Sequence, residues 1–481
     1  MTTTIDITDP VLLRIAALAH ERGVRAFVVG GYVRDSFMGR ARTDIDICVE
    51  GDAMAFARDV AELFRSKTVE YERFRTALVP VGDHHIEFVG TRREEYRADS
   101  RKPVVVEGTF EDDLRRRDFT VNALAADLHP ERLGEVVDLF DGIGDIGRKV
   151  LRTPLDPTVT MSDDPLRMMR AARFASQLDF DLHPALVASM TSMADRIAII
   201  SQERITDEFL KILASPRPSI GLKILQSVGL LKHVFPEVAN LAGTDLVVAG
   251  SREYGHKDVF LHTLQVVDNV AAMSSNVWLR FATLMHDIAK PRTKKFIEGT
   301  GWTFHGHEEI GARWQQKIFR RLRLPMQHLD YVETLVRLHQ RPMKLVDEGV
   351  TDSAIRRLAV QAGDGISDLF MLCRADITTR NPARAQKYLR NYDVVEEKLN
   401  DVLERDRLRS FQSPVRGEEI MAVTGLGPSR EVGYIKWMIE EAILDGLIPN
   451  EEGAARDLMM KNLEQWKLEG RTAHFARRGA L

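Results

Sequence analysis

Two aspartates stand two positions apart in a segment that otherwise favours burial in a sheet. The segment TDIDICVEG carries Asp44 and Asp46 among Ile45, Ile47 and Val49. Because side chains at i and i+2 leave the same face of a strand, both carboxylates point one way and repel each other. Divalent cations between them remove that repulsion, and two such ions suit phosphoryl transfer. The pattern predicts a metal site, with a solvated strand face as the alternative.

A glycine pair precedes these aspartates. The apolar stretch AFVV ends in Gly30 and Gly31 and leads into the polar helical stretch YVRDSFMG. Glycine lets backbone N–H groups approach an anion closely, and a helix N-terminus favours negative charge. We therefore expect a phosphate cradle beside the carboxylates, and Glu87, in the candidate strand HHIEFVG, as a third carboxylate from a neighbouring strand.

The middle of the chain is rich in histidine. Seven of the 14 histidines lie between residues 250 and 405: His256, His262, His286, His305, His307, His328 and His339. Imidazoles combined with carboxylates suit a transition metal that polarises a phosphoester and lowers the pKa of bound water. This region predicts a second, different metal chemistry.

Length and composition set the frame for both sites. A length of 481 residues indicates several domains. Because the net charge is only -4, any nucleic acid must be bound by local basic patches. Cys48 and Cys373 are the only cysteines, which excludes a disulfide framework and fits a reducing compartment. The start MTTTIDITDP lacks a leader pattern, and no stretch approaches the about 18–20 apolar residues of a membrane span. We expect a cytoplasmic protein without membrane contact.

The periodicity changes along the chain. Asp9 and Pro10 predict the start of an amphipathic helix, and TALVPVG and HHIEFVG predict strands. After about residue 155 the spacing is helical. The predicted fold is an α/β head with a small mixed sheet, followed by a mostly helical neck, a histidine-rich domain and a tail. The predicted boundaries are 1–150, 151–245, 246–405 and 406–481.

Two motifs of the head resemble a known family. GGYVRDSFMGRARTDIDICV and RRRDFTVNALA are similar to the first and second motifs of the class II CCA-adding tRNA nucleotidyltransferases and their poly(A) polymerase relatives, which are polymerase-β-type nucleotidyltransferases. The resemblance implies Mg²⁺ on Asp44 and Asp46, with CTP, ATP and the 3′ end of tRNA as partners. The nucleotide-binding residues expected in these motifs are Gly30, Gly31, Arg34, Arg116, Arg117, Asp118 and Asn122.

MSDDPLRMMRAARFASQLDF resembles the family motif that selects the incoming base. We expect Asp164 and Arg167 at i and i+3 on one helix face, with Arg170 as a further nucleotide contact. Asp164 would accept from the exocyclic amine of cytosine or adenine, and Arg167 would donate to the ring acceptors. The family usually has glutamate where this chain has Asp163, and we expect Asp163 to cap a helix instead.

Two further segments invite comparison with the family. ERITDEFLKIL resembles the next motif, with Glu203, Arg204 and Glu208 as structural supports or, alternatively, surface pairs. EEYRADSRKPVVVEGTFEDDL is long and loop-like, and in the family a flexible loop here accompanies the switch from CTP to ATP.

The histidine-rich segments LHTLQVVDNV, LMHDIAKP, FHGHEEIGA, RLHQRP and LCRADITTR resemble the HD phosphohydrolase superfamily in their order. The implied metal ligands are His262, His286, Asp287, His307, His339 and Asp376, with His305 as an alternative to His307. The metal would be Ni, Mn, Fe or Co, and the substrates small phosphoesters such as 2′,3′-cyclic phosphates at RNA ends. We expect Cys373 to be a packed core residue.

The tail resembles the carboxy-terminal region of CCA-adding enzymes, and its basic residues are candidate tRNA contacts: Arg416, Arg430, Lys436, Lys467, Arg471, Arg477 and Arg478. We predict template-independent CCA addition with an additional HD phosphohydrolase. Poly(A) polymerase, a CC- or A-adding specialist, and an inactive tRNA- or nucleotide-binding regulator are the alternatives. The sequence leaves the oligomeric state open.

Overall fold

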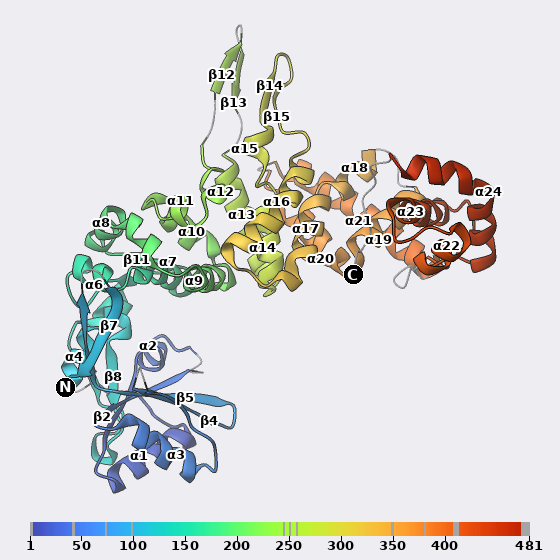
Figure 1. The fold of residues 1–481 in the computed structure, drawn as a ribbon. Coiled ribbons are helices and arrows are strands. Elements are labelled where there is room, and N and C mark those ends of the chain that lie inside the picture. The colour runs from blue at the N-terminus through green and yellow to red at the C-terminus, as the bar shows by residue number, and fades with distance from the viewer. Residues whose placement is uncertain are drawn as a thin grey trace. The chain divides into compact units, whose positions relative to one another are not determined.

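The chain forms two compact units in the computed structural model (Figure 1). The structure describes residues 3–40, 44–72, 75–97, 100–243, 246–249, 252–255, 258–347, 351–379, 381–406 and 413–472. The first unit comprises Met1–Asn240 and Arg321–Leu324, and the second Leu241–Arg320 and Pro325–Leu481. Within these described ranges, no helix combines the length and apolar character that crossing a membrane requires.

A seven-stranded sheet organises the start of the first unit, in the order β3-β4-β5-β2-β1-β8-β9. The strands are β1 (Arg25–Val29), β2 (Ile45–Glu50), β3 (Val69–Tyr71), β4 (Thr76–Val81), β5 (His84–Gly90), β8 (Leu124–Asp127) and β9 (Val136–Asp138). β2 and β5 are parallel and the other neighbours antiparallel. The predicted mixed sheet is confirmed.

Helices cover the sheet on both faces. Helices α1 (Pro10–Glu21) and α3 (Ala53–Leu63) bury Leu12, Ile15 and Phe56 in the main core. On the other face, α4 (Phe110–Arg115) stacks Phe110 on Phe27 with ring centroids 4.1 Å apart. The predicted start of α1 is correct, because the Asp9 carboxylate accepts from the Val11 N–H at 2.8 Å.

The segment expected to be a long loop is a hairpin. β6 (Arg92–Arg97) and β7 (Ser100–Glu107) pair antiparallel, with Arg93 opposite Val106. The valines at positions 104–106 favour extended structure, which explains why this segment forms strands and not a loop. Residues 98 and 99 lie outside the described ranges.

The remainder of the first unit is helical, apart from the short pair β10 (Val150–Leu151) and β11 (Asp181–Leu182). Its helices are α2 (Gly31–Phe37), α5 (Gly142–Arg148), α6 (Pro157–Asp163), α7 (Leu166–Leu178), α8 (Pro184–Ser192), α9 (Gln202–Ala214), α10 (Pro218–Ser227), α11 (Leu231–Val234) and α12 (Pro236–Ala239). Helix α7 is the central one, since α9 and α10 both pack on it. Gly221 permits this close approach, because a Cβ there would lie only 2.5 Å from Ser176 Oγ, which accepts from the Gly221 N–H at 2.7 Å.

The second unit is also mostly helical. Its helices are α13 (Val259–Met273), α14 (Val277–Met285), α15 (Lys290–Thr293), α16 (His307–Leu322), α17 (Leu329–Leu338), α18 (Arg341–Asp347), α19 (Asp352–Ala362), α20 (Ile366–Ala375), α21 (Pro382–Asp406), α22 (Gly417–Thr424), α23 (Arg430–Leu444) and α24 (Glu452–Gly470). Two hairpins join them: β12 (Leu246–Ala249) with β13 (Arg252–Gly255), and β14 (Lys295–Ile297) with β15 (Gly301–Thr303). Helices α22 to α24 have their own core, built around Ile435, Met459 and Trp466.

Candidate active sites

Three carboxylates gather at one end of the parallel pair β2 and β5. Asp46 lies directly opposite Glu87 in the register, and Asp44 immediately precedes β2. Within the described ranges, sets of three or more potential metal ligands within 4.8 Å occur only in the second unit. The carboxylates of the first unit are thus more widely spaced, and Asp44 and Glu87 are exposed to solvent.

The electrostatics of Asp46 link the three groups. Burial is the main cause that raises its pKa to about 6; the charge of Arg117 opposes this rise, and the charges of Glu87 and Asp44 add to it. A carboxylate held in this way binds a proton readily when no cation is present. The donor set of oxygen atoms suits Mg²⁺, whose binding would relieve the same repulsion.

We predict that Asp46 makes the stability of the metal-free protein depend on pH. Because its folded pKa lies above the unfolded value of 3.8, its protonation favours folding below about pH 4, and that contribution is lost as pH rises through 6. The expected cost at pH 7 is about 3 kcal/mol. Hydrogen exchange of β1 and β2 amides in EDTA should show Asp46→Asn gaining protection over wild type as pH rises. A gain of equal size at every pH would contradict this.

Gly30 lets a guanidinium approach the carboxylates. Gly30 has φ +70°, and a Cβ there would lie 3.2 Å from Arg117 Nη1 and 3.9 Å from Asp46 Oδ2. Asp113, fully buried, holds Arg117 through an ion pair of 3.1 Å. Gly31 begins α2 beside this point. The glycine pair thus lies beside the carboxylates, as expected, and also beside the Arg117 guanidinium.

The second motif forms one buried polar network. Asp118 Oδ2 accepts from Arg170 Nε at 2.7 Å, and its Oδ1 accepts from Asn122 Nδ2 at 3.1 Å. Arg34 donates to Asn122 Oδ1 at 2.7 Å and also pairs with Asp35. Although burial acts to raise it, the pKa of Asp118 is lowered by Arg170 and Asn122. These four expected nucleotide contacts, Arg34, Asp118, Asn122 and Arg170, therefore lie together, and hydrogen bonds among them fix their orientations.

The prediction that Asp164 lies on a helix is wrong. Asp164 is extended (φ -139°, ψ 100°) between α6 and α7, because it precedes Pro165 and the proline ring disfavours the helical conformation there. Its Oδ1 accepts from the Leu166 N–H at 3.1 Å, so Asp164 takes the capping role expected of Asp163, which ends α6. Arg167 donates to the Arg116 carbonyl at 2.6 Å.

The residues expected to be supports differ in their roles. Glu208 is buried and faces Arg173 at 3.1 Å. Glu203 pairs with the exposed Arg323. Arg204 contacts Asp164 Oδ2 at 2.9 Å, so it holds the candidate base-selecting carboxylate directly. This contact could not be predicted from local sequence, because it joins a residue of α9 to one 40 positions earlier in the chain.

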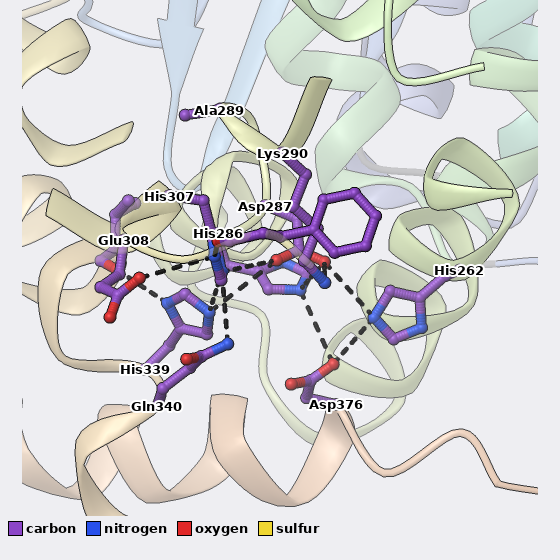
Figure 2. Close-up of polar contacts among 12 residues, drawn as sticks. His262, His286, Asp287, Ala289, Lys290, His307, Glu308, His339, Gln340 and Asp376 are labelled. Atoms are coloured by element: carbon purple, nitrogen blue, oxygen red, sulfur yellow. Dashed lines mark hydrogen bonds and ion pairs between the residues drawn. The ribbon is translucent and has the colours of Figure 1, made fainter. Parts of the chain in front are cut away.

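The structure brings all six expected ligands of the second unit together (Figure 2). They come from the ends of helices, where chain direction changes: His262 on α13, His286 and Asp287 after α14, His307 at the start of α16, His339 after α17 and Asp376 after α20. They form two groups, each within 4.8 Å: His262, His286 and Asp376, and Asp287, His307 and His339. Asp287 bridges the groups, with His286 Nε2 and His307 Nε2 each 3.2 Å from its carboxylate.

All four imidazoles are oriented by their Nδ1 atoms. His286 Nδ1 lies 2.6 Å from the Thr283 carbonyl, His307 Nδ1 2.7 Å from Phe304 O, and His339 Nδ1 2.8 Å from Val336 O. His262 Nδ1 lies 2.9 Å from Thr378 Oγ1. Such contacts fix the tautomer and turn Nε2 inward, as in histidines that bind metals.

The charge balance of this cluster fits a divalent cation. His286 Nε2 and both carboxylate oxygens of Asp287 are buried without hydrogen bonds of good geometry. Despite opposing burial, the neighbouring carboxylates raise the pKa of His286 to about 10. Burial lowers the pKa of His339 to about 4. Nitrogen and oxygen ligands in two groups suit a pair of transition-metal ions.

Three further residues lie at or near the cluster, and of these Lys290 was not predicted from the sequence. Lys290 Nζ lies 2.6 Å from Asp287 Oδ2, and the three-residue spacing on a helical turn was the available signal. His305 is exposed, whereas His307 lies in the cluster and is the candidate ligand. Cys373 is buried as expected, and its Sγ donates to the His339 carbonyl at 2.9 Å.

Comparison with known proteins gives these sites a context. The poly(A) polymerase head-domain model matches residues 26–152, a model described as a probable RNA and SrmB-binding site of polymerase A matches 179–241, and the HD-domain model matches 259–364. The A-adding tRNA nucleotidyltransferase of Deinococcus radiodurans is 32% identical over 427 residues, covering 87% of this chain and 91% of that protein. The chain belongs to the tRNA nucleotidyltransferase and poly(A) polymerase family.

Other members of this family are similar over most of their length. The CC-adding enzyme of Thermus thermophilus is 32% identical over 449 residues, covering 90% of this chain and 93% of that protein. A multifunctional CCA protein of Methylococcus capsulatus is 32% identical over 371 residues, covering 74% and 82%. The CCA-adding enzyme of Bacillus stearothermophilus in complex with CTP shares the fold, with TM-score 0.67, 23% identity, and coverage of 96% and 100%.

The exposure of the basic residues in the tail does not single out one of them as a tRNA contact. Arg416, Arg430 and Arg471 are exposed, while Lys436 and Lys467 are half-buried. Arg477 and Arg478 lie outside the described residues. The basic residues of this region therefore remain candidates as a group.

Proposed function

We propose that this chain adds the C-C-A sequence to the 3′ end of tRNA from CTP and ATP without a nucleic-acid template. The observation that carries the proposal is the Asp46–Glu87 register beside Asp44, with Gly30 and Arg117 next to it. Relatives of similar length are named A-adding, CC-adding and multifunctional CCA enzymes. Catalytic inactivity is disfavoured because the charged network around Asp118 is complete.

The reaction transfers a nucleotidyl group. The terminal ribose hydroxyl of tRNA attacks the α-phosphorus of CTP or ATP, the new P–O bond forms, and pyrophosphate leaves as the α–β bridge bond breaks. Mg²⁺ held by Asp44 and Asp46 would supply charge neutralisation and lower the pKa of the hydroxyl. Arg117 lies where it neutralises phosphate charge, and the Asp118–Asn122 pair offers polar groups to the sugar.

Base selection would reside in Asp164 and Arg167. Accepting the exocyclic amine and donating to a ring acceptor favours cytosine and adenine over uracil and guanine. For Asp164 to do so, its carboxylate must keep the orientation that Arg204 and the Leu166 N–H give it.

We predict that Asp164→Ala relaxes nucleotide selection more than it slows the reaction. The preference for CTP over UTP should fall by about 10–100-fold, because the mispaired base no longer leaves the carboxylate acceptor of Asp164 unsatisfied. Single-nucleotide incorporation with each of the four triphosphates measures this, with Asp163→Ala as the matched control. Equal loss of rate with all four triphosphates would contradict a selecting role.

Stepwise incorporation tests the proposed product. Transcripts ending at the discriminator base should accept two cytidines from CTP alone, and transcripts ending in CC should accept one adenosine from ATP alone. Addition of only C or only A would assign the chain to a CC- or A-adding specialist. Repeated addition from ATP alone would identify a poly(A) polymerase.

We infer a second function, phosphoester hydrolysis, at the His262–Asp376 cluster. The observation that favours it is the inward orientation of all four histidines around Asp287. A pair of transition-metal ions (Ni, Mn, Fe or Co) held there would supply a hydroxide at neutral pH and polarise the phosphoryl group. Water would add to phosphorus while a ribose oxygen of a 2′,3′-cyclic phosphate leaves with a proton. Lys290 lies at this cluster and would contact the anionic phosphoryl oxygens.

We also propose functional boundaries and a location. The head at 1–150 would hold the triphosphate, the neck at 151–245 would select the base, residues 246–405 would hydrolyse phosphoesters, and 406–481 would contribute tRNA contacts. A cytoplasmic location is proposed from the tRNA substrate.

A further inference from the structure

A large cavity opens beside the metal cluster of the second unit. Its volume is about 980 Å³, and the cluster residues His262, His339 and Asp376 form part of its wall. A phosphate group alone occupies a small part of such a space, which lies at the upper end of the about 300–1,000 Å³ range of small-molecule sites. The cavity therefore has room for an extended substrate whose reactive phosphate reaches the metals.

One wall of this cavity is the first part of helix α21. Arg384, Lys387, Tyr388 and Asn391 all line it. Their spacing of three, four and seven residues puts them on one helical face. Ion pairs from Arg374 to Asp393, at 2.8 Å, and to Glu396 hold the helix against α20. The wall is therefore fixed with respect to the cluster.

The lining residues carry an excess of positive charge. Four cations, Lys290, Lys344, Arg384 and Lys387, face a single carboxylate, Asp376. Lys290 is paired with Asp287, and Lys344 with Glu308 at 2.9 Å. The two cations of α21 differ, because no carboxylate within the described ranges forms an ion pair with either one. Arg384 instead donates to the Tyr388 hydroxyl at 2.7 Å, which orients its guanidinium beside an aromatic ring.

We propose that Arg384 and Lys387 bind a second phosphate of the substrate, one nucleotide away from the phosphoester at the metal cluster. The substrate class is then the 3′ end of an oligonucleotide. A guanidinium and an ammonium beside a tyrosine ring form the combination that binds a nucleic-acid backbone and stacks a base. This subsite rests on the proposed phosphohydrolase function, and it deepens that function by assigning the residues that bind the neighbouring phosphate of such an RNA end.

Comparison of a dinucleotide with a mononucleotide tests the subsite. Both would carry a 2′,3′-cyclic phosphate, on cytidylyl-adenosine and on adenosine respectively, and kcat/KM would be measured on the full chain with Mn²⁺, Ni²⁺ or Co²⁺. Wild type should prefer the dinucleotide by about tenfold, as expected for one charge-assisted phosphate contact. The double variant Arg384→Gln/Lys387→Gln should lose this preference while its mononucleotide rate stays unchanged. Arg390→Gln, on the same helix but outside the cavity lining, is the matched control.

Two results would overturn the subsite. One is that wild type shows no preference for the dinucleotide. The other is that the double substitution lowers kcat/KM equally for both substrates. If wild type hydrolyses neither substrate, the phosphohydrolase proposal itself fails, and fluorescence anisotropy of a labelled dinucleotide then decides the subsite. The subsite is supported if the double variant binds the labelled dinucleotide tenfold more weakly than wild type and Arg390→Gln does not. Unchanged binding, or stronger competition by a phosphopeptide than by unlabelled dinucleotide, overturns it.

Discussion

Replacing both Asp44 and Asp46 with alanine is expected to abolish nucleotide addition to tRNA. The loss should reach at least about 1,000-fold in rate, equivalent to ~4 kcal/mol of transition-state stabilisation, because two of the three carboxylates proposed to hold the metal at the attacking hydroxyl are removed. Glu87 alone, opposite position 46, cannot replace them. Incorporation of labelled CTP into a tRNA transcript with Mg²⁺ measures the effect.

A control on the same strand separates chemistry from folding. Glu50 ends β2 and pairs with Arg25 at 2.8 Å, away from the carboxylate group. Glu50→Gln should retain near wild-type addition. The double variant should also leave the proposed phosphoester hydrolysis unchanged, because the histidine and aspartate cluster lies in the other unit. Activity of the Asp44/Asp46 variant within tenfold of wild type would refute the assignment of these residues.

Removing the bridging carboxylate of the second unit is expected to have a comparable effect on a different reaction. Asp287→Asn should lower metal affinity and hydrolysis of cyclic phosphates by about 100-fold, because Asp287 contacts a histidine of each of the two groups. Nucleotide addition should be unaffected. Metal analysis after purification, combined with hydrolysis assays before and after chelation, checks both parts.

The histidines of FHGHEEIGA offer a matched pair for the same site. His307 lies in the cluster with its Nδ1 on the Phe304 carbonyl, whereas His305, two residues earlier, is exposed. His307→Gln should lose metal and hydrolysis, and His305→Gln should lose neither. Equal effects of the two substitutions, or hydrolysis that survives chelation and Asp287→Asn, would contradict a metal-dependent site here.

In the first site, features that depend on neighbouring residues could be predicted from the sequence, whereas contacts between distant segments could not. Alternation around Asp44 and Asp46 indicated a strand and a shared face, which are local properties. The Asp46–Glu87 register depends on which strands pair, and the approach of Arg117 to Gly30 depends on tertiary packing. Asp164 differs, because the proline after it favours an extended conformation, and this local effect overrides the helical spacing of the motif.

The same contrast between local and long-range features holds for the second site. The resemblance to the HD superfamily implied all six members of the cluster, with His305 as an alternative to His307. Their division into two groups, and the backbone carbonyls that orient three of the histidines, come from the ends of separate helices that meet in space. The wall on α21 was not predicted, since its basic and aromatic residues look like an ordinary solvated helix face until the cavity is known.

The most direct test of the central claim is the mass of the product formed on a tRNA transcript that ends at the discriminator base. With CTP, ATP and Mg²⁺ present together, the account predicts an increase equal to two cytidylates and one adenylate, and no further growth on prolonged incubation. The Asp44→Ala/Asp46→Ala variant should leave the transcript unchanged. A wild-type product that stops before the adenylate, continues past it, or never forms would contradict the claim that this chain completes the CCA end.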